Sequence, residues 1–318
     1  MRTNSHEKKD SSLRGAVSPT LALAAFWCFW YTHDMVESGS NEQLEMLEHL
    51  LGAELSEQKT SNMRNTEQES KVEGGAGAYQ AIRSTASSVV EVRPDLGREQ
   101  RKGVPEIIFG ETKDAAQIIV MAQGLLAGSG RAIISRLCPD LVAPVSAAFH
   151  EYKVRIHEVA HAMVIYRSDY VPMRTGGHVG VISAGTSDIP VAEEAALIAE
   201  EMGCQVTRIY DVGVAGLHRL FEPLRDLLTH AVDVIIVAAG MDGALPSVVA
   251  GFVPVPVIGL PTSIGYGLGG KGVAALLSML QTCAPGLSVV NIDNGVGAGI
   301  TAALIANRVA RAREHQSQ

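Results

Sequence analysis

The segment Ser183-Ala-Gly-Thr-Ser-Asp188 has the residue types that bind a phosphate group. It follows an apolar stretch and precedes a helical pattern whose first turn contains Pro190, a position that favours proline because its missing N–H would have no partner. Free backbone N–H groups at such a helix start, together with the hydroxyls of Thr186 and Ser187, can hold an anion. In the structural alternative Ser187 or Asp188 only caps the helix, and the two roles are compatible.

Two further segments carry charged side chains. His218 and Arg219 follow DVGVAG (211–216), where an arginine can clamp a phosphate or carboxylate through two N–H groups, although plain surface exposure also explains it. Asp242 lies in the glycine-lined turn GMDGALP (240–246). Partial removal from water would favour proton uptake by this carboxylate and suit it to proton transfer, whereas a solvated loop aspartate would have no such role.

Cys283 ends an apolar helix predicted over 272–282. A thiol at a helix C-terminus lies at the negative end of the helix dipole, so a reactive Cys283 needs a neighbouring base or a cationic ligand. Asp242 and a pyridinium ring would supply these, and an inert buried thiol is the alternative. Cys138 and Cys204 are interpreted as structural. The spacing of the cysteines fits neither a disulfide framework nor a zinc site, which favours a reducing, cytoplasmic compartment.

The segment His157-Glu-Val-Ala-His161 matches the H-E-x-x-H pattern of zinc metalloproteases, in which both histidines lie on one helix face and bind metal. The pattern is short and no third ligand is apparent. We therefore interpret it as a surface or interdomain helix, and the metal content of the chain stays open.

Five apolar stretches alternate with helical patterns after Gly176-Gly177. This rhythm predicts an α/β fold, with a doubly wound parallel sheet covered by helices on both faces. Such sheets bind ligands at the carboxyl ends of their strands. All five strand ends carry glycine, small polar or acidic residues, which favours a nucleotide-like ligand; the segments are 183–188, 211–216, 240–244, 261–267 and 291–299.

The rest of the chain suggests a smaller N-terminal α/β domain over 78–177, with strands at 106–110 and 131–135 and a helix at 114–126. The catalytic domain is expected over 178–310 and a tail over 311–318. Residues 1–77 form a divergent extension, with an amphipathic helix at 41–54, a polar linker at 56–77 and an apolar run at 16–31. That run is shorter than the roughly 20 residues of a membrane span, so a membrane location is not expected; an organelle-targeting or membrane-associated segment and a variable, partly buried extension are the alternatives.

Composition excludes one class of partner. The 318 residues carry a formal net charge of -8 and 5% aromatic residues, with 32 glycines. Nucleic-acid binding needs a basic face and stacking side chains, so nucleic acid is not an expected partner. A small anionic ligand must then be held by local groups such as helix N-termini.

The motifs AGTSDIPVAEEA, YDVGVAGLHR, AAGMDGALPSVVAG, LPTSIGYG, TCAPG and VVNIDNGVGAG occur in one order that resembles the LarB family, which acts early in nickel-pincer nucleotide cofactor synthesis. The resemblance covers 103–309 and includes GVPEIIFGETK in the small domain. The C-terminal domain of LarB proteins is in turn similar to aminoimidazole ribonucleotide (AIR) carboxylase, PurE. This implies a flavodoxin-like, three-layer fold.

The resemblance implies carboxylation of the pyridinium ring of nicotinic acid adenine dinucleotide and hydrolysis of its phosphoanhydride, giving pyridinium-3,5-biscarboxylic acid mononucleotide and AMP. It further implies carbon dioxide or bicarbonate as co-substrate, Mg²⁺, no tightly bound cofactor and a homo-oligomer, an octamer as in the purine carboxylases. Cys283 would add to ring carbon 4, and Asp242, often Glu in the family, would accept the proton. Substrate would be bound by Ser183, Gly185, Thr186, Ser187, Asp188, Asp211, Gly213, His218, Arg219, Gly240, Met241, Gly243, Ser263, Gly265, Asn291, Asp293 and Asn294.

Two alternatives remain open. An AIR carboxylase or mutase acts on an electron-rich ring that needs no thiol, so Cys283 separates it from the LarB reaction. A non-catalytic nucleotide-binding homologue would bind the dinucleotide without turnover.

Overall fold

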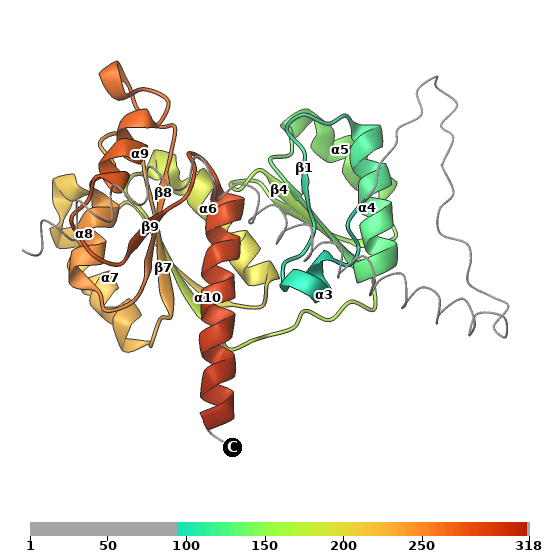
Figure 1. Cartoon of the computed structure of the whole chain (residues 1–318). Helices are drawn as coiled ribbons and strands as arrows, with labels where there is room; N and C mark the ends of the chain where they lie inside the picture. The colour runs from blue at the N-terminus through green and yellow to red at the C-terminus, as the bar shows by residue number, and fades with distance from the viewer. Residues whose placement is uncertain (1–93, 317–318) are drawn as a thin grey trace, which may run out of the picture. The chain divides into compact units, whose positions relative to one another are not determined.

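The computed structural model describes residues 94–316, all of which belong to one compact unit of the chain, 83–318. The helix, linker and apolar run predicted within residues 1–77 lie outside the described residues. Two sheets divide the described part into a small lobe, residues 94–167, and a large lobe, residues 178–316 (Figure 1).

The small lobe has a four-stranded mixed sheet in the order β1-β2-β4-β3. Strands β1 and β2 pair in parallel, whereas β4 runs antiparallel to both of its neighbours. The strands and the helix predicted in this region are confirmed, and a hairpin follows them that the sequence patterns did not reveal. The elements are α3 (Arg98–Lys102), β1 (Ile107–Phe109), α4 (Ala115–Ser129), β2 (Arg131–Ser135), α5 (Pro139–Ala148), β3 (Lys153–His157) and β4 (Ala162–Tyr166).

Local sequence fixes both ends of α4. The Asp114 carboxylate accepts a hydrogen bond from the Gln117 N–H at 2.8 Å, and the Gln117 side chain accepts one from the Asp114 N–H at 3.1 Å. This reciprocal pair satisfies two N–H groups that a helix start leaves without intrahelical partners. Gly130, with φ of 79°, ends the helix in the left-handed conformation that glycine adopts without steric cost.

The interpretation of 157–161 as a helix is wrong. His157 is the last residue of β3, and the following residues form the turn into β4, where His161 has φ of 47°. In a hairpin the two histidines are not on one helix face, so the spacing that makes H-E-x-x-H a zinc motif has no meaning here. Val154 and Ile156 alternate with polar residues in β3, and β4 is a short buried run rich in β-branched and aromatic residues, so both stretches favour the extended conformation.

The large lobe has a five-stranded parallel sheet in the order β6-β5-β7-β8-β9. This is the flavodoxin-like doubly wound topology and confirms the predicted fold. Strands β5 and β7 are buried throughout because helices cover both faces of the sheet. The strands are β5 (His178–Ser183), β6 (Gln205–Ile209), β7 (Val234–Ala239), β8 (Val257–Pro261) and β9 (Leu287–Val289).

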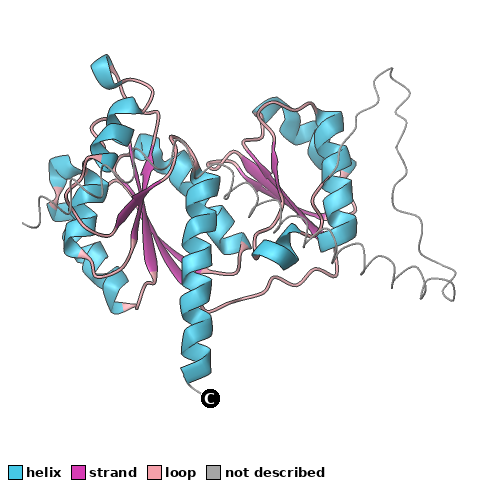
Figure 2. Ribbon diagram, in the orientation of Figure 1, coloured by secondary structure: helices cyan, strands magenta, loops and turns pink. Residues whose placement is uncertain are grey.

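Two layers of helices enclose this sheet (Figure 2). One layer packs through alanine and glycine: a Cβ added to Gly299 would lie 2.5 Å from the carbonyl oxygen of Ala195, so the two helices can approach closely only without it. This layer has α6 (Ile189–Glu201) and α10 (Gly295–Gln316). The other layer has α7 (His218–Thr229), α8 (Leu245–Phe252) and α9 (Val273–Leu280). Short 3-10 turns η2 (Thr186–Asp188), η3 (Val214–Gly216) and η4 (Gly267–Gly269) lie in the connecting loops.

The two lobes share one core. Ile133 and Val164 of the small sheet belong to the same buried apolar cluster as α6 and α10. Arg131, 5% exposed, donates to Glu201 at 3.1 Å and to Glu99 at 2.6 Å, and it also donates to the Glu201 carbonyl. The lobes are therefore joined by apolar packing and by a buried guanidinium. Among residues 94–316, no helix is long and apolar enough to cross a membrane.

Candidate active site at the carboxyl edge of the large sheet

Hydrogen bonds join the loops at the carboxyl ends of the large-lobe strands. The hydroxyl of Thr262, after β8, donates to the Asp188 carboxylate, after β5, at 2.6 Å. The N–H of Ser263 donates to the Asp293 carboxylate, after β9, at 2.8 Å. The N–H of Met241, after β7, donates to the Ile264 carbonyl at 2.8 Å. Loops distant in sequence thus form one polar rim, which we call the carboxyl edge.

Asp188 is an internal support of this edge. Its side chain is buried, and it accepts hydrogen bonds from the Thr262 hydroxyl and from the Gly185 N–H at 2.9 Å. Burial raises the pKa of this carboxyl above its ordinary value, against the opposing effect of those hydrogen bonds. Asp188 therefore orders the loop that carries Thr186 and Ser187, both of which are exposed.

Several predicted residues have structural roles at the edge. Buried Ser183 accepts a hydrogen bond from the Asp211 N–H at 3.2 Å. Asn294 accepts one from the Gly297 N–H at 2.8 Å and so caps α10. A Cβ on Gly240 would lie 2.3 Å from the Ile264 carbonyl oxygen, so only glycine allows these two loops to touch.

Most of the remaining predicted binding residues are accessible from solvent. Arg219 is paired with Asp211 at 2.9 Å, and the left-handed φ of 58° at Asp211 turns its side chain into that contact. Gly213 is half-buried and Gly243 is buried in its turn. The exposed group at the edge comprises Thr186, Ser187, His218, Met241, Ser263, Gly265 and Asn291.

Asp242 lies three residues after β7 and is exposed. Its carboxylate accepts a weak hydrogen bond from the Ala244 N–H, at 3.4 Å. Within a single copy of the protein, the Asp242 side chain is open to solvent and lacks the apolar environment expected from the sequence. Its position at the carboxyl edge, however, is the predicted one.

Cys283 lies at the opposite end of the sheet. It precedes β9, and the carbonyl of Gly286 in the same loop accepts a hydrogen bond at 3.0 Å from the N–H of Val257, the first residue of β8. The loop is thus at the amino ends of the strands, and Asp242 is at their carboxyl ends. Cys283 is exposed. One chain therefore brings the predicted binding residues together but does not bring Cys283 to them.

A cavity of about 360 Å³ opens at the carboxyl edge and is walled on its other side by the small lobe. Three predicted residues line it: Ser187, Ser263 and Asp293. The small lobe contributes residues that had no predicted binding role, chiefly Glu111, Arg136, Cys138 and His161, and α6 contributes Glu194.

Arg136 and Glu194 are the main residues missed from sequence. Glu194 is buried, accepts a hydrogen bond from Ser135 and lies 3.5 Å from Nε of Arg136; burial raises its pKa. A signal existed: Glu194 follows Val191 and precedes Ile198 at helical spacing, so a charge stands on the buried face of a helix. Arg136 directly follows a predicted strand, which is also where ligand-binding residues gather.

The cysteines other than Cys283 have different environments. Cys204 is buried, and burial raises the pKa of its thiol to about 11, in agreement with a structural role. Cys138, interpreted from the sequence as structural, is exposed before α5 and lines the cavity. Cys28 lies outside the described residues.

Within residues 94–316, no cluster of three or more His, Cys, Asp or Glu side chains has the arrangement of a metal site. The carboxylate of Asp293 is engaged by Ser263 and that of Glu194 by Ser135. Mg²⁺ commonly binds through only one or two carboxylates together with substrate phosphates, so the Mg²⁺ implied by the family resemblance stays a prediction.

Comparison with known proteins agrees with this two-lobe organisation. Residues 178–318 match the AIR carboxylase family, and residues 87–167 match the LarB/PurE-like N-terminal domain. The uncharacterized protein MJ0165 of Methanocaldococcus jannaschii is 44% identical over 217 residues, 67% of this chain and 82% of that protein. N5-carboxyaminoimidazole ribonucleotide mutases of Thermotoga maritima and M. jannaschii are 35% and 36% identical over 134 and 125 residues, 40% and 38% of this chain and 73% and 74% of those proteins.

The two relationships differ in extent. The match to MJ0165 is longer than the 178–318 domain and must include part of the small lobe, whereas the mutase matches are about the length of that domain alone. The matched AIR carboxylase family and the ribonucleotide mutases are enzymes of the carboxylase and mutase type. The combination of both domains shows that the chain belongs to the LarB family, with a PurE-like AIR carboxylase domain as its large lobe.

Proposed function

We propose that this protein carboxylates the pyridinium ring of nicotinic acid adenine dinucleotide at carbon 5 and hydrolyses the phosphoanhydride, releasing pyridinium-3,5-biscarboxylic acid mononucleotide and AMP. The observation that carries the proposal is the carboxyl edge, where hydrogen bonds join the loops after β5, β7, β8 and β9 and the exposed residues Ser187 and Ser263 line a cavity. Membership of the LarB family supports it.

A pyridinium carbon is electron-poor and cannot attack carbon dioxide unaided. Addition of a thiolate at carbon 4 forms a C–S bond and gives a neutral dihydropyridine, whose carbon 5 is enamine-like and forms a C–C bond to carbon dioxide. Loss of the carbon 5 proton to a carboxylate then expels the thiolate and restores the pyridinium ring. In this proposal Cys283 supplies the thiolate and Asp242 accepts the proton. Attack of water on the phosphoanhydride is a separate step.

Because Cys283 and Asp242 lie at opposite ends of one sheet, we infer that the thiol reaching a given site comes from a second copy of the chain. Exposed apolar side chains support self-association. Val273, Leu277 and Leu280 form a stripe along α9 and are 50%, 59% and 62% exposed, and the segment 262–283 has one charged residue, Lys271. An uncharged apolar surface is complementary to a copy of itself, and apolar patches of this kind mark interfaces.

The proposal is tested by incubating the full chain with the dinucleotide and ¹³C-labelled bicarbonate and analysing the products by mass spectrometry. We expect AMP and a mononucleotide heavier by one labelled carboxylate. Absence of both products in the wild type would refute the proposal, and retention of wild-type activity in Cys283→Ala would refute the thiol step.

The similarity to N5-carboxyaminoimidazole ribonucleotide mutases favours a second candidate, the mutase reaction on that ribonucleotide. It requires no thiol. Turnover of N5-carboxyaminoimidazole ribonucleotide that is unaffected by Cys283→Ala, without turnover of the dinucleotide, would establish this candidate. Binding of the dinucleotide without any turnover would favour a non-catalytic homologue.

A further inference from the structure

One wall of the cavity at the carboxyl edge comes from the small lobe. Its residues Glu111, Arg136 and His161 come from the small lobe, whereas the matches to ribonucleotide mutases are about the length of the large-lobe domain. A ribonucleotide has one nucleotide half. The dinucleotide of the proposed function has an additional adenylate, so the additional wall and the additional half of the ligand correspond.

Among residues 94–316, Arg136 is the only Lys or Arg that lines this cavity. Its guanidinium donates to the Asp293 carbonyl and lies 4.9 Å from the centre of the Phe109 ring, so its plane is held in place by the large lobe and by an aromatic face. The residue has a left-handed φ of 50°, a conformation that costs free energy for a non-glycine residue and often marks a functional position.

Two carboxylates also lie near this guanidinium: buried Glu194, 3.5 Å from Nε, and Glu111, whose ion pair is the more exposed and the weaker of the two. Nη1 lies 3.3 Å from Glu111, and the two side chains are 31% and 56% exposed, so water competes with this ion pair. A phosphate oxygen in place of the Glu111 carboxylate would make a shorter, charge-assisted hydrogen bond to the same nitrogen. Glu111 therefore occupies the position of an anion that a ligand can displace.

A second cavity, of about 340 Å³, adjoins the first around the start of α5. Leu137, Pro139 and His161 line both cavities. Its walls are mostly apolar, with Val142 and Ile156 among them, and His157 and Glu158 add polar groups. Burial lowers the pKa of His157, so its imidazole is neutral at pH 7, and its Nε2 is a buried atom without a hydrogen-bond partner among the described residues.

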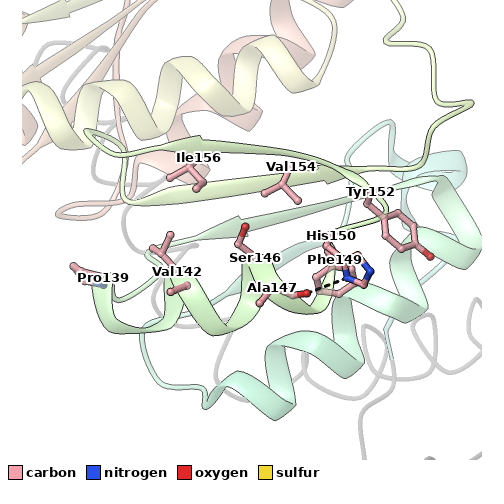
Figure 3. A pocket seen from close by; sticks show the side chains of 10 residues that line it. Pro139, Val142, Ser146, Ala147, Phe149, His150, Tyr152, Val154 and Ile156 are labelled. Atoms are coloured by element: carbon pink, nitrogen blue, oxygen red, sulfur yellow. Dashed lines mark hydrogen bonds between the residues drawn. The ribbon is translucent and has the colours of Figure 1, made fainter.

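The second cavity continues into a wider groove between α5 and β3. Figure 3 shows Val142 and Ser146 of α5 on one side of this groove and Val154 and Ile156 of β3 on the other. A flat aromatic base packs against aliphatic walls of this kind, and carboxylate and imidazole groups hydrogen-bond to an amine or to ribose hydroxyls.

This inference rests on the proposed function, in which the ligand is a dinucleotide. We propose that the small lobe binds the adenylate half of that dinucleotide, with the phosphate at Arg136 and the adenosine in the cavity around the start of α5. The nicotinate half then lies over the large lobe at Ser187 and Ser263. The small lobe thereby determines specificity for a dinucleotide over a mononucleotide.

Binding of AMP and of nicotinic acid mononucleotide to the full chain, measured by isothermal titration calorimetry, tests this assignment. Loss of a charge-assisted hydrogen bond should weaken AMP binding roughly 10- to 100-fold in Arg136→Ala, with partial recovery in Arg136→Lys. Binding of the mononucleotide should change less than about twofold, because that ligand makes no contact with the small lobe. Glu111→Gln should bind AMP at least as tightly as wild type.

Two further variants distinguish ligand contact from folding. Val142→Trp fills the second cavity from the surface of α5 and should weaken AMP binding without affecting Arg136. Arg155→Ala, which removes another small-lobe arginine that stacks on Tyr166 outside both cavities, should leave AMP binding unchanged. Thermal melting of each variant shows whether the fold is retained.

Undiminished AMP binding in Arg136→Ala or in Val142→Trp would overturn the assignment, as would equal losses for AMP and the mononucleotide. These results are independent of turnover. If the wild type fails to carboxylate the dinucleotide but binds AMP through Arg136, the proposed function is refuted and the adenylate site is retained. If the wild type carboxylates the dinucleotide but AMP binding does not depend on Arg136, the proposed function is retained and the adenylate site is refuted.

Discussion

Mixing two inactive variants tests whether Cys283 acts in the site of another copy. Cys283→Ala removes the thiol and Asp242→Asn removes the proton acceptor, so each variant alone should be inactive. The hydrogen bond between Gly286 and Val257 places the Cys283 loop at the amino ends of the strands, whereas Asp242 follows the carboxyl end of β7. Only a site assembled from two copies can therefore contain both groups.

The expected recovery follows from counting. In an equimolar mixture assembled at random, half of the copies have Cys283 and half have Asp242, so about one quarter of the sites receive both from different copies. Co-refolding the two variants and measuring carboxylated product should thus give about 25% of wild-type activity. If each site used both residues of one chain, the mixture would stay inactive.

As a matched control, the variant Leu280→Asp tests the α9 stripe and leaves both reacting groups, Cys283 and Asp242, unchanged. Analytical ultracentrifugation should show that this variant is defective in self-association. An inactive mixture of Cys283→Ala and Asp242→Asn, recorded while wild type is active and oligomeric, would refute the two-copy site.

Three further outcomes are expected. Arg131→Ala should lower the free energy of unfolding in urea by about 3–5 kcal/mol, because Glu201, 11% exposed, loses its cationic partner and keeps, among the described residues, only the Tyr166 hydroxyl as a side-chain donor; a loss below about 1 kcal/mol would contradict this. Gly299→Ala should lower the free energy of unfolding by about 1–3 kcal/mol, because the added Cβ forces two helices apart. Gly251→Ala has open space around its added Cβ and should raise the free energy of unfolding by about 0.4–1 kcal/mol. A melting temperature higher for Gly299→Ala than for Gly251→Ala would contradict both expectations. Burial raises the pKa of Glu194, so the protonated side chain favours folding. This stabilisation is complete below the unfolded pKa of about 4.3 and is lost as pH rises through the folded pKa. Glu194→Gln should remove that part of the pH dependence of the free energy of unfolding in urea titrations, and identical pH profiles of variant and wild type would argue against it.

Much of the fold could be predicted because its patterns are local. Strand β7 is an uninterrupted apolar run, and α6 begins at a proline after a polar loop, so both elements follow from residue type and spacing. The hairpin of β3 and β4 was missed because the H-E-x-x-H spacing within it also suits a helix. Only the pairing of Val154 with Ile165 and of Ile156 with Met163 decides that this stretch is extended.

The same limit applies to the candidate site. Sequence order with the rule for parallel sheets correctly brought Asp188, Thr262 and Asp293 to neighbouring loops. It gave no means of placing Arg136, because that residue belongs to another sheet and reaches the cavity through the packing of one lobe on the other.

By itself the sequence determined the alternation of strands and helices, the polar strand ends and the family, because each of these depends on residues that are neighbours along the chain. Tertiary structure alone decided which of the chemically competent residues meet. Cys283 and Asp242 look equally suited to one site in the sequence, but a parallel sheet places every strand start at one edge and every strand end at the other, and their loops fall on opposite edges.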